Sequence, residues 1–272
     1  MPKKPTEWHV ADDGLPARVV GPWVDRKAWF VDALVGIFGT GMKRRWSRRA
    51  YLELFAGPGL SWDRAKHRIV RGSALRALSR DFTDYAYVDL DSIAVDALTK
   101  RVSALDLGDR RVSVLPPMDC NDAVPALRTA IPSDALTLAF IDPTNWQVRL
   151  DTIAALTEGR RVDLLVTFHI GSMKRVAHLR PRALTDFFGT DSWRSAFNRP
   201  HWEHTEALAE LYNRQLEQLG YLSGTYPHRV AVRNSTNAVI YELIGFSKHD
   251  RGVDFWRKAT RIDERGQTGF WS

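Results

Sequence analysis

Cysteine is nearly absent from this sequence, and its scarcity excludes several classes of protein. Cys120 is the only one among 272 residues, so we expect neither a disulfide framework nor a cysteine-built metal site. Apolar runs are short too, since none approaches the roughly 18 residues of a membrane-spanning helix. The opening residues, MPKKPTEWHV, lack the apolar stretch of a secretory signal. The sequence therefore predicts a cytoplasmic protein without a membrane partner or metal site.

The overall composition is that of a globular, basic chain. Apolar residues make up 44%, enough for a core, and the length predicts a single domain over residues 1–272. The net charge is +7, concentrated in three runs: KRRWSRR (43–49), RAKHRIVR (64–71) and KRVAHLRPR (174–182). Such runs are more often solvated faces, but near the ends of strands they would attract a polyanion such as nucleic acid. Trp46, inside the first run, is suited to stacking on a base.

Strands and helices alternate through the first two thirds of the chain. The expected strands are 50–55, 85–89, 112–116, 135–142 and 162–169, and the expected helices are about 22–38, 72–80, 92–102, 119–130 and 148–157. A spacing of about 30 residues between strands predicts a doubly wound, mostly parallel α/β sheet with right-handed crossovers.

The pattern changes after His169. Residues 171–200 are polar and basic and predict a helical insert with short helices near 182–188 and 191–197. A helix over about 202–219 follows, then strands near 224–233 and 238–246 that predict a closing antiparallel hairpin, and a last helix at 252–262. Five strand–helix units with a terminal antiparallel pair are the layout of S-adenosylmethionine (SAM)-dependent methyltransferases with a Rossmann-like fold.

Polar residues and glycines stand where these strands end, which is where ligands bind in such sheets. The first strand runs into YLELFAGPG (51–59), a loop in which Phe55, Gly57 and Gly59 let a ligand approach the backbone. Glu53, just before it, is placed to face a bound cation. The acids that follow the next strands are Asp89, Asp91, Asp119 and Asp142.

An adenosine-bearing ligand explains these placements. The glycine loop would pass under its sugar and amino-acid tail. Asp89 can accept hydrogen bonds from both ribose hydroxyls, and Asp119 can accept one from the adenine amino group. Any one acid at a strand end is as readily the N-cap of the next helix, and Asp91 fits that alternative best.

The sequence resembles the three-Cys-motif partner family, a branch of SAM-methyltransferase-like proteins. The matching pieces, in order, are GPWVDRKAWFVDAL, LELFAGPG, GSALRAL (72–78), YVDLDS (87–92), FIDP (140–143), FGTDSWR (188–194) and FSKHDRGVDFWRKA (246–259). The resemblance implies a methyltransferase-type fold, SAM as cofactor, and an iron–sulfur, radical-SAM-like partner that carries the three cysteines.

The segment after the fourth strand departs from the family pattern. Family members usually have D-P-F-G there, and amino-methyltransferases of nucleic acids have D-P-P-aromatic, in which the aspartate accepts from the target amino group. This chain has Asp142-Pro143-Thr144-Asn145-Trp146, so the second proline is missing. By this comparison Asp142 and Pro143 are catalytic candidates. Asn145 and Trp146 are substrate-binding candidates, with Trp146 stacking on a flipped base.

Three more polar residues lie near strand ends. His169 ends the fifth strand and can act as a base, although a structural histidine is the more common case. Lys248 and His249 follow the last strand and either hold a phosphate or cap the next helix.

Three hypotheses for the function stay open. The first is a SAM-dependent methyltransferase acting on DNA, RNA or a nucleotide-derived substrate. The second is a non-catalytic protein that binds nucleic acid and assists the iron–sulfur partner. The third is a small-molecule methyltransferase.

Overall fold

The computed structural model describes residues 8–21, 24–169, 173, 177–222, 229–233 and 239–260. The chain divides into two compact units, Met1–Leu138 and Ala139–Ser272, each of which is described by itself below. In the described part of the chain no helix is both long and apolar enough to span a membrane.

A parallel sheet forms the centre of the first unit. Strands β3 (Arg49–Leu54), β6 (Asp84–Val88) and β7 (Arg111–Val114) pair in parallel in that order, with Leu54 opposite Val88. Every residue of β3 and β6 is buried, as expected of strands covered on both faces. The helices of this unit are α1 (Val24–Met42), α2 (Ser73–Ala77), α3 (Ser92–Ser103) and α4 (Val124–Ala130).

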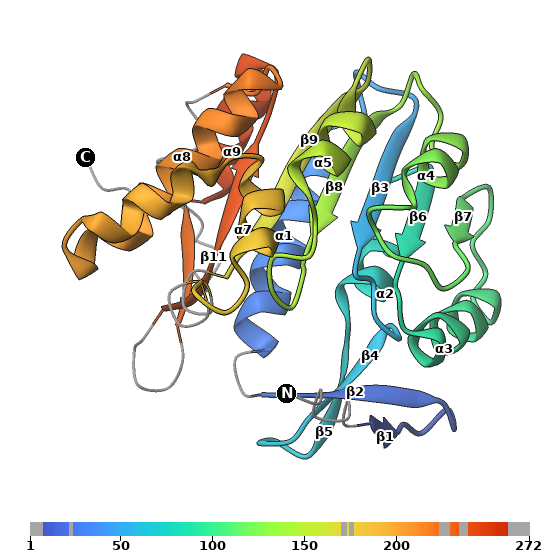
Figure 1. Ribbon diagram of the computed structural model, residues 1–272. Coiled ribbons are helices and arrows are strands. Elements are labelled where there is room, and N and C mark those ends of the chain that lie inside the picture. Colours follow the sequence, from blue (N-terminus) through green and yellow to red (C-terminus); the bar gives the residue numbers. More distant parts are fainter. Residues whose placement is uncertain are drawn as a thin grey trace. The chain divides into compact units, whose positions relative to one another are not determined.

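A second, four-stranded sheet lies in the same unit and was not predicted from the sequence. Its order is β1-β2-β4-β5, and Figure 1 shows it beneath the carboxyl ends of β3 and β6. The strands are β1 (Trp8–Val10), β2 (Pro16–Val20), β4 (Leu60–Asp63) and β5 (Arg68–Arg71). Strand β2 pairs in parallel with β4, across some forty residues of chain, and antiparallel with β1.

Strand β8 (Leu136–Ile141) spans the boundary between the units and is wholly buried. In the first unit it is the neighbour of β3, where the Leu136 N–H donates to the Arg48 carbonyl at 3.2 Å. In the second unit its neighbour is β9.

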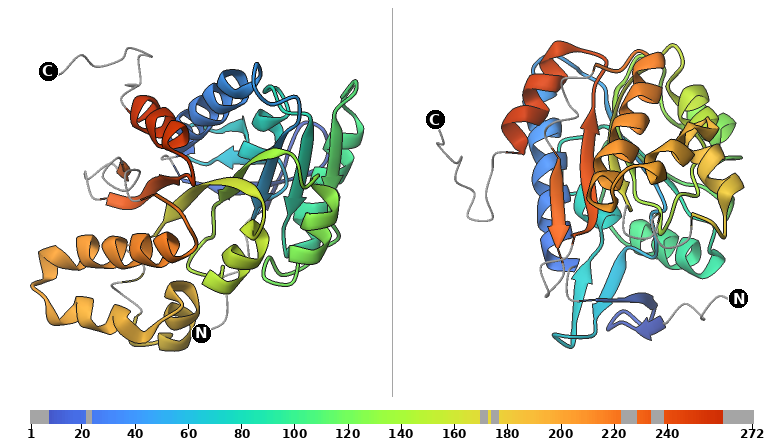
Figure 2. Two further views of the ribbon diagram at one scale, coloured as in Figure 1. Left: turned by 90° about the horizontal axis from the view of Figure 1, so that it is seen from above. Right: turned by 60° about the vertical axis from the view of Figure 1, so that its left-hand side comes forward.

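The second unit ends its sheet with antiparallel strands. Strand β9 (Arg161–Phe168) pairs antiparallel with β11 (Val239–Phe246), and β11 pairs antiparallel with β10 (Val230–Arg233). The predicted closing hairpin is therefore confirmed, while its connection at 234–238 lies outside the described residues. The helical elements, coloured from yellow-green to red in Figure 2, are α5 (Leu150–Thr157), α7 (Pro181–Phe188), η1 (Asp191–Asn198), η2 (His201–Glu203), α8 (His204–Gln218) and α9 (Asp250–Ala259).

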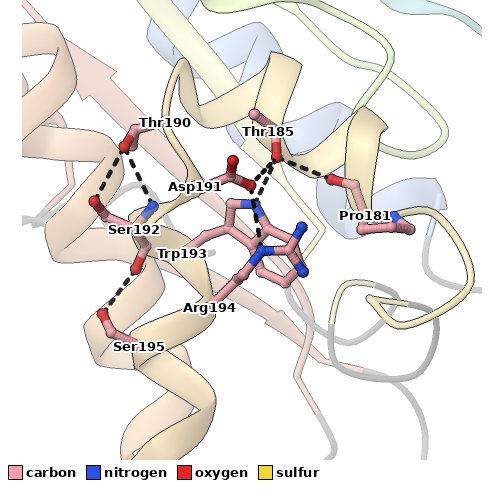
Figure 3. A network of polar contacts seen from close by, with 8 residues as sticks. All are labelled: Pro181, Thr185, Thr190, Asp191, Ser192, Trp193, Arg194 and Ser195. Atoms are coloured by element: carbon pink, nitrogen blue, oxygen red, sulfur yellow. Dashed lines mark hydrogen bonds and ion pairs between the residues drawn. The ribbon is translucent and has the colours of Figure 1, made fainter.

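A polar network closes the turn between α7 and η1, as Figure 3 shows. The Thr185 hydroxyl lies 2.7 Å from Asp191 Oδ1 and accepts from the Trp193 indole N–H at 3.0 Å. Arg194 reaches the same carboxylate at 3.3 Å and lies over the Trp193 ring. Asp191, Trp193 and Arg194 belong to FGTDSWR (188–194), one of the segments on which the family resemblance rests. In this structure that segment shapes the fold of the helical insert.

The predicted fold class is confirmed: the protein is α/β, with a mostly parallel central sheet and a terminal antiparallel pair. Most predicted elements match observed ones to within a few residues. The largest difference among the early helices is α4, which begins at Val124 rather than near Asp119. Asp119 is instead part of the loop that precedes this helix, where its carboxylate binds Asn121.

Candidate functional site

The glycine loop after β3 has an unusual backbone. Phe55, Gly57 and Gly59 all have positive φ, at 75°, 62° and 85°. This region is rare for a residue with a side chain, so Phe55 holds local strain of the kind that gathers at ligand sites. The N–H groups of Phe55 and Ala56 both donate to the Val88 carbonyl at 2.9 Å, which fixes the loop against β6.

The two glycines of this loop differ in their surroundings. A Cβ atom at Gly59 would come within 2.9 Å of Leu75 Cγ, so the loop packs tightly on α2 at that point. A Cβ atom at Gly57 would meet nothing within 4 Å, so the loop backbone is open there. A ligand can therefore approach the chain closely at Gly57 but not at Gly59.

Asp89 joins the second strand end to this open loop. Its Oδ2 accepts from the Gly57 N–H at 2.7 Å, and its Oδ1 accepts from the Asp91 N–H at 3.0 Å. An ionised carboxylate has about four acceptor positions, so about two remain for a ligand. The residue is 9% exposed, which places those acceptors at the edge of the protein interior.

The other two acids of this edge have different surroundings. Asp91 is the N-cap of α3, as the alternative prediction held, and it accepts from the Ile93 N–H at 3.0 Å. Asp119 is half-buried, and its Oδ1 accepts from both the backbone and the side chain of Asn121. The Met118 N–H donates to the Asp89 carbonyl at 3.1 Å. The loops after β3, β6 and β7 are therefore held together by hydrogen bonds.

The single cysteine lies in the last of these loops but is not a nucleophile. Cys120 is buried, and burial together with the adjacent Asp119 raises the pKa of its thiol to about 12. The thiol therefore stays protonated at physiological pH. Among the described residues no group of His, Cys, Asp and Glu could hold a metal ion.

Glu53 lies inside the unit rather than at its surface. The carboxylate is fully buried, accepts from the Tyr51 hydroxyl at 2.9 Å and is bonded by Ser73 on α2. The structure thus shows it joining β3 to α2. We predicted from the sequence that Glu53 faces a bound cation. Among the described residues, however, no group of His, Cys, Asp and Glu that could hold a metal ion includes it.

A buried arginine on α3 anchors the glycine loop to the small sheet. The Arg101 guanidinium donates to the Pro58 carbonyl at 2.6 Å and to the Pro16 carbonyl at 2.8 Å. It also forms a two-point ion pair with Asp13, whose pKa is lowered by the hydrogen bond from this arginine. Arg101 was not predicted as a buried residue, because an arginine in a predicted helix looks the same in the sequence whether it is exposed or buried.

In the second unit, the segment after β8 is held by Gln147. Its side chain accepts from the Asn145 N–H at 2.9 Å and donates to the Thr144 hydroxyl at 2.9 Å. Asp142 and Asn145 are half-buried and Pro143 is buried. The proposed stacking role of Trp146 is wrong for this structure, because the residue is only 4% exposed and belongs to the core.

Lys248 and His249 were expected near a substrate, but the strand direction places them at the wrong end of β9. Strand β11 is antiparallel to β9, with Glu242 opposite Phe168 and Phe246 opposite Leu164. His169 therefore follows the carboxyl end of β9, with its ring 5.2 Å from that of Tyr241, whereas Lys248 and His249 lie at the amino end. The three residues cannot form one site.

The contacts at that amino end are structural. His249 Nδ1 accepts from the Arg251 N–H at 3.2 Å and caps α9, which is one of the two roles predicted for it. The Lys248 ammonium lies 4.8 Å from the centre of the Tyr221 ring, and burial lowers its pKa. The Ser247 hydroxyl donates to Asp163 Oδ1 at 2.8 Å, and desolvation raises the pKa of Asp163 to about 7.

The basic runs do not form one rim. Residues 43–49 precede β3 and residues 64–71 follow its loop, so the two runs lie at opposite ends of that strand. The first run is largely paired: Lys43 bonds Asp81 at 3.0 Å, and Arg49 is buried with its Nε on the Asp81 carbonyl. Part of the third run, 174–176, lies outside the described residues.

No protein-family model matches the sequence, and no curated protein does. Among solved structures, the chain is similar to a Legionella pneumophila protein of family-model DUF519, with a TM-score of 0.50 and 10% identity over 84% of this chain and 89% of that one. Two others are a DUF574 family protein from Streptomyces avermitilis (TM-score 0.46, 15% identity, 82% of each chain) and magnesium protoporphyrin IX methyltransferase from Synechocystis with bound SAH (TM-score 0.44, 10% identity, 82% and 83%). At these identities the likeness concerns the fold alone.

Proposed function

We propose that this chain is a SAM-dependent methyltransferase that acts on nucleic acid or on a nucleotide-derived substrate. The observation that carries the proposal is the 2.7 Å hydrogen bond from the Gly57 N–H to Asp89, which fixes a carboxylate with spare acceptors beside an open stretch of backbone. Ribose hydroxyls are donors that such a carboxylate can bind, and the open backbone leaves room for the rest of the ligand.

The residues of the first unit fit an adenosyl group. The Gly57–Gly59 loop would lie under the sugar and the amino-acid tail, Asp89 would accept from the ribose hydroxyls, and Asp119 would accept from the adenine amino group. Bound SAM supplies a methyl group on a sulfonium centre, open to in-line attack by a lone pair. In the described part of the site the protein contributes position and hydrogen bonds rather than a nucleophile.

The residues of the second unit would handle the acceptor. Asp142, directly after β8, would accept a hydrogen bond from the target amino group and leave the nitrogen lone pair free to attack. His169, which ends β9 and is half-buried, would take the proton that the nitrogen loses. Asn145, half-buried beside Asp142, would bind the substrate.

Calorimetric titration with SAM and with S-adenosylhomocysteine tests the cofactor site. We expect micromolar binding to the wild-type chain and a loss of about 10²- to 10⁴-fold in Asp89→Ala, because two hydrogen bonds to a charged group are worth about 1.5–3 kcal/mol each. Asp106→Asn is the matched control, since this exposed aspartate also accepts a backbone N–H two residues on, from Gly108 at 3.1 Å. No heat of binding with either ligand would exclude the proposal.

The substrate class is tested by salt. A nucleic-acid substrate would bind to the basic chain with an affinity that falls steeply as salt rises. Methyl transfer to small acceptors without any RNA or DNA binding at low salt would favour the small-molecule methyltransferase instead.

A second candidate function is a non-catalytic protein that assists an iron–sulfur, radical-SAM-like partner carrying three cysteines. The segment after β8 favours it, because Thr144 replaces the second proline and Trp146 is buried, so the described loop offers no aromatic face to a base. Co-expression with a neighbouring three-cysteine protein should then give a stable complex. Separate elution of the two proteins in gel filtration at micromolar concentration would reject this candidate.

A further inference from the structure

The small sheet of the first unit carries a pocket that none of the roles above uses. The pocket measures about 280 Å³ and is lined by Trp8, His9, Val19, Trp62 and Arg64. The rings of His9 and Trp62 are stacked, with centroids 3.8 Å apart and an interplanar angle of 16°. Val19 of β2 is paired with Trp62 of β4, so the strands themselves set the aromatic floor.

Positive side chains stand on the elements that form this pocket, with Arg64 in its lining. The turn between β4 and β5 exposes Arg64, Lys66 and Arg68, and on β2 the Arg18 guanidinium lies 5.5 Å from the centre of the Trp8 ring. The acid of the hairpin, Asp63, is fully buried, and its Oδ1 accepts from the backbone N–H groups of the turn. That carboxylate therefore shapes the turn and leaves its outer surface basic.

Aromatic rings beside guanidinium and ammonium groups are the chemistry that recognises a nucleobase and its phosphate. A positively charged ligand, such as a methylated ammonium ion in an aromatic cage, is disfavoured. Arg64 would repel it, and none of the five lining residues is acidic. The volume lies just below the roughly 300–1,000 Å³ of small-molecule sites, which suits a single base rather than a larger ligand.

We propose that the sheet β1-β2-β4-β5 binds single-stranded nucleic acid, with one base in the pocket at Trp62 and the phosphates along residues 64–68. The inference rests on the proposed function, of which it names the surface that holds the substrate. Single strands are favoured because an unpaired base is needed to reach the stacked rings.

The connection of this sheet to the glycine loop supports the assignment. Strand β4 begins at Leu60, directly after Gly59, and the Gly72 N–H at the end of the hairpin donates to the Gly59 carbonyl at 2.8 Å. Arg101 joins Pro58 of the loop to Pro16 of β2. The small sheet is therefore joined by direct hydrogen bonds to the loop of the candidate adenosyl site, in the same unit.

Fluorescence anisotropy with labelled oligo-U and oligo-dT of about 12 nucleotides, added to the full chain, tests the inference. Trp62→Leu should weaken binding by about 5- to 150-fold, and Trp62→Phe should restore most of it, because stacking on one base is worth that much. Arg64→Gln should reduce the slope of log affinity against log salt by about 0.7. Lys100→Gln, an exposed lysine on α3 of the same unit, should change neither quantity.

Two results would overturn the inference. One is unchanged affinity in a Trp62→Leu variant whose circular dichroism is that of the folded protein. The other is competition by poly-glutamate as effective as that by unlabelled oligonucleotide, which would indicate an acidic protein partner. If Trp62→Leu does not fold, the exposed Arg64→Gln variant decides through its salt slope.

SAM titration of the same samples separates this inference from the proposed function. SAM binding without oligonucleotide binding would refute the inference alone. The chain could instead bind oligonucleotide through Trp62 but bind neither SAM nor its product. That result would refute the proposed methyltransferase function and support the nucleic-acid-binding surface.

Discussion

Replacement of Asp163 by asparagine should stabilise the second unit at neutral and alkaline pH. Asp163 lies near the amino end of β9, and burial of its carboxyl raises the pKa of this group from 3.8 to about 7. The gap is 7 − 3.8, or about 3 units, and each unit is worth about 1.4 kcal/mol. Ionised Asp163 therefore lowers the free energy of unfolding by at most about 4 kcal/mol.

The sign of the effect follows from proton binding. Below about pH 4 both the folded and the unfolded chain hold the proton, so the group has no effect on stability. As the pH rises the unfolded chain releases the proton first, which favours unfolding until the folded carboxyl also ionises near pH 7. The advantage of Asp163→Asn should thus be about 2 kcal/mol at pH 5 and about 4 kcal/mol at pH 8.

Urea unfolding of both proteins between about pH 5 and 9, followed by circular dichroism, measures this difference. Asparagine keeps an oxygen that can accept from Ser247, so the contact itself is preserved. Lys248, whose pKa is lowered by burial, is present in both proteins. Burial keeps the pKa of Tyr221 well above its usual value of 10, so this tyrosine stays neutral in both proteins over the pH range used. Asp186→Asn, on the exposed face of α7, is the control for the loss of a carboxylate at the surface. A constant difference for Asp163→Asn, or lower stability at pH 8, would refute the reasoning.

Three further substitutions test the loop and the insert. Arg101→Leu should lower the free energy of unfolding by about 3–5 kcal/mol and weaken SAM binding, while Arg101→Lys should lose less, as thermal unfolding and calorimetry would show. Gly57→Ala should lower the free energy of unfolding by roughly 1–2 kcal/mol through backbone strain alone. Gly59→Ala should lower it further, because the new Cβ atom would also clash with Leu75. Equal losses for the two variants in urea unfolding would contradict this. Thr185→Val should lower stability by about 1–3 kcal/mol by leaving a buried indole N–H unpaired, whereas Thr129→Val, which removes a similar bond to a carbonyl four residues back, should have little effect.

The parallel core was predictable because its signals are local. Strands such as β8 are continuous apolar runs, and the acid at each strand end is visible in the sequence. Asp91 shows the same locality, since an N-cap depends only on the next three residues.

The features that escaped prediction depend on distant pairing. The small sheet joins β2 to β4 across some forty residues, and its strands of three to five residues carry no clear alternation, so residues 64–71 were interpreted only as a basic run. Lys248 was misplaced because the antiparallel direction of β11 reverses which end of the sheet its last residue reaches. Trp146 looked available because a residue at a strand end is not marked in sequence as part of the core.

The guanidinium of Arg101 makes the small sheet and the glycine loop thermodynamically dependent on each other. One buried cation holds carbonyls from both, so a shift of either backbone changes the hydrogen bonds of the other. Linkage then requires reciprocity: whatever factor an oligonucleotide on β1-β2-β4-β5 adds to the affinity for an adenosyl ligand, that ligand returns to the oligonucleotide. The affinity for S-adenosylhomocysteine, measured with and without oligonucleotide, would give the sign and the size of this factor.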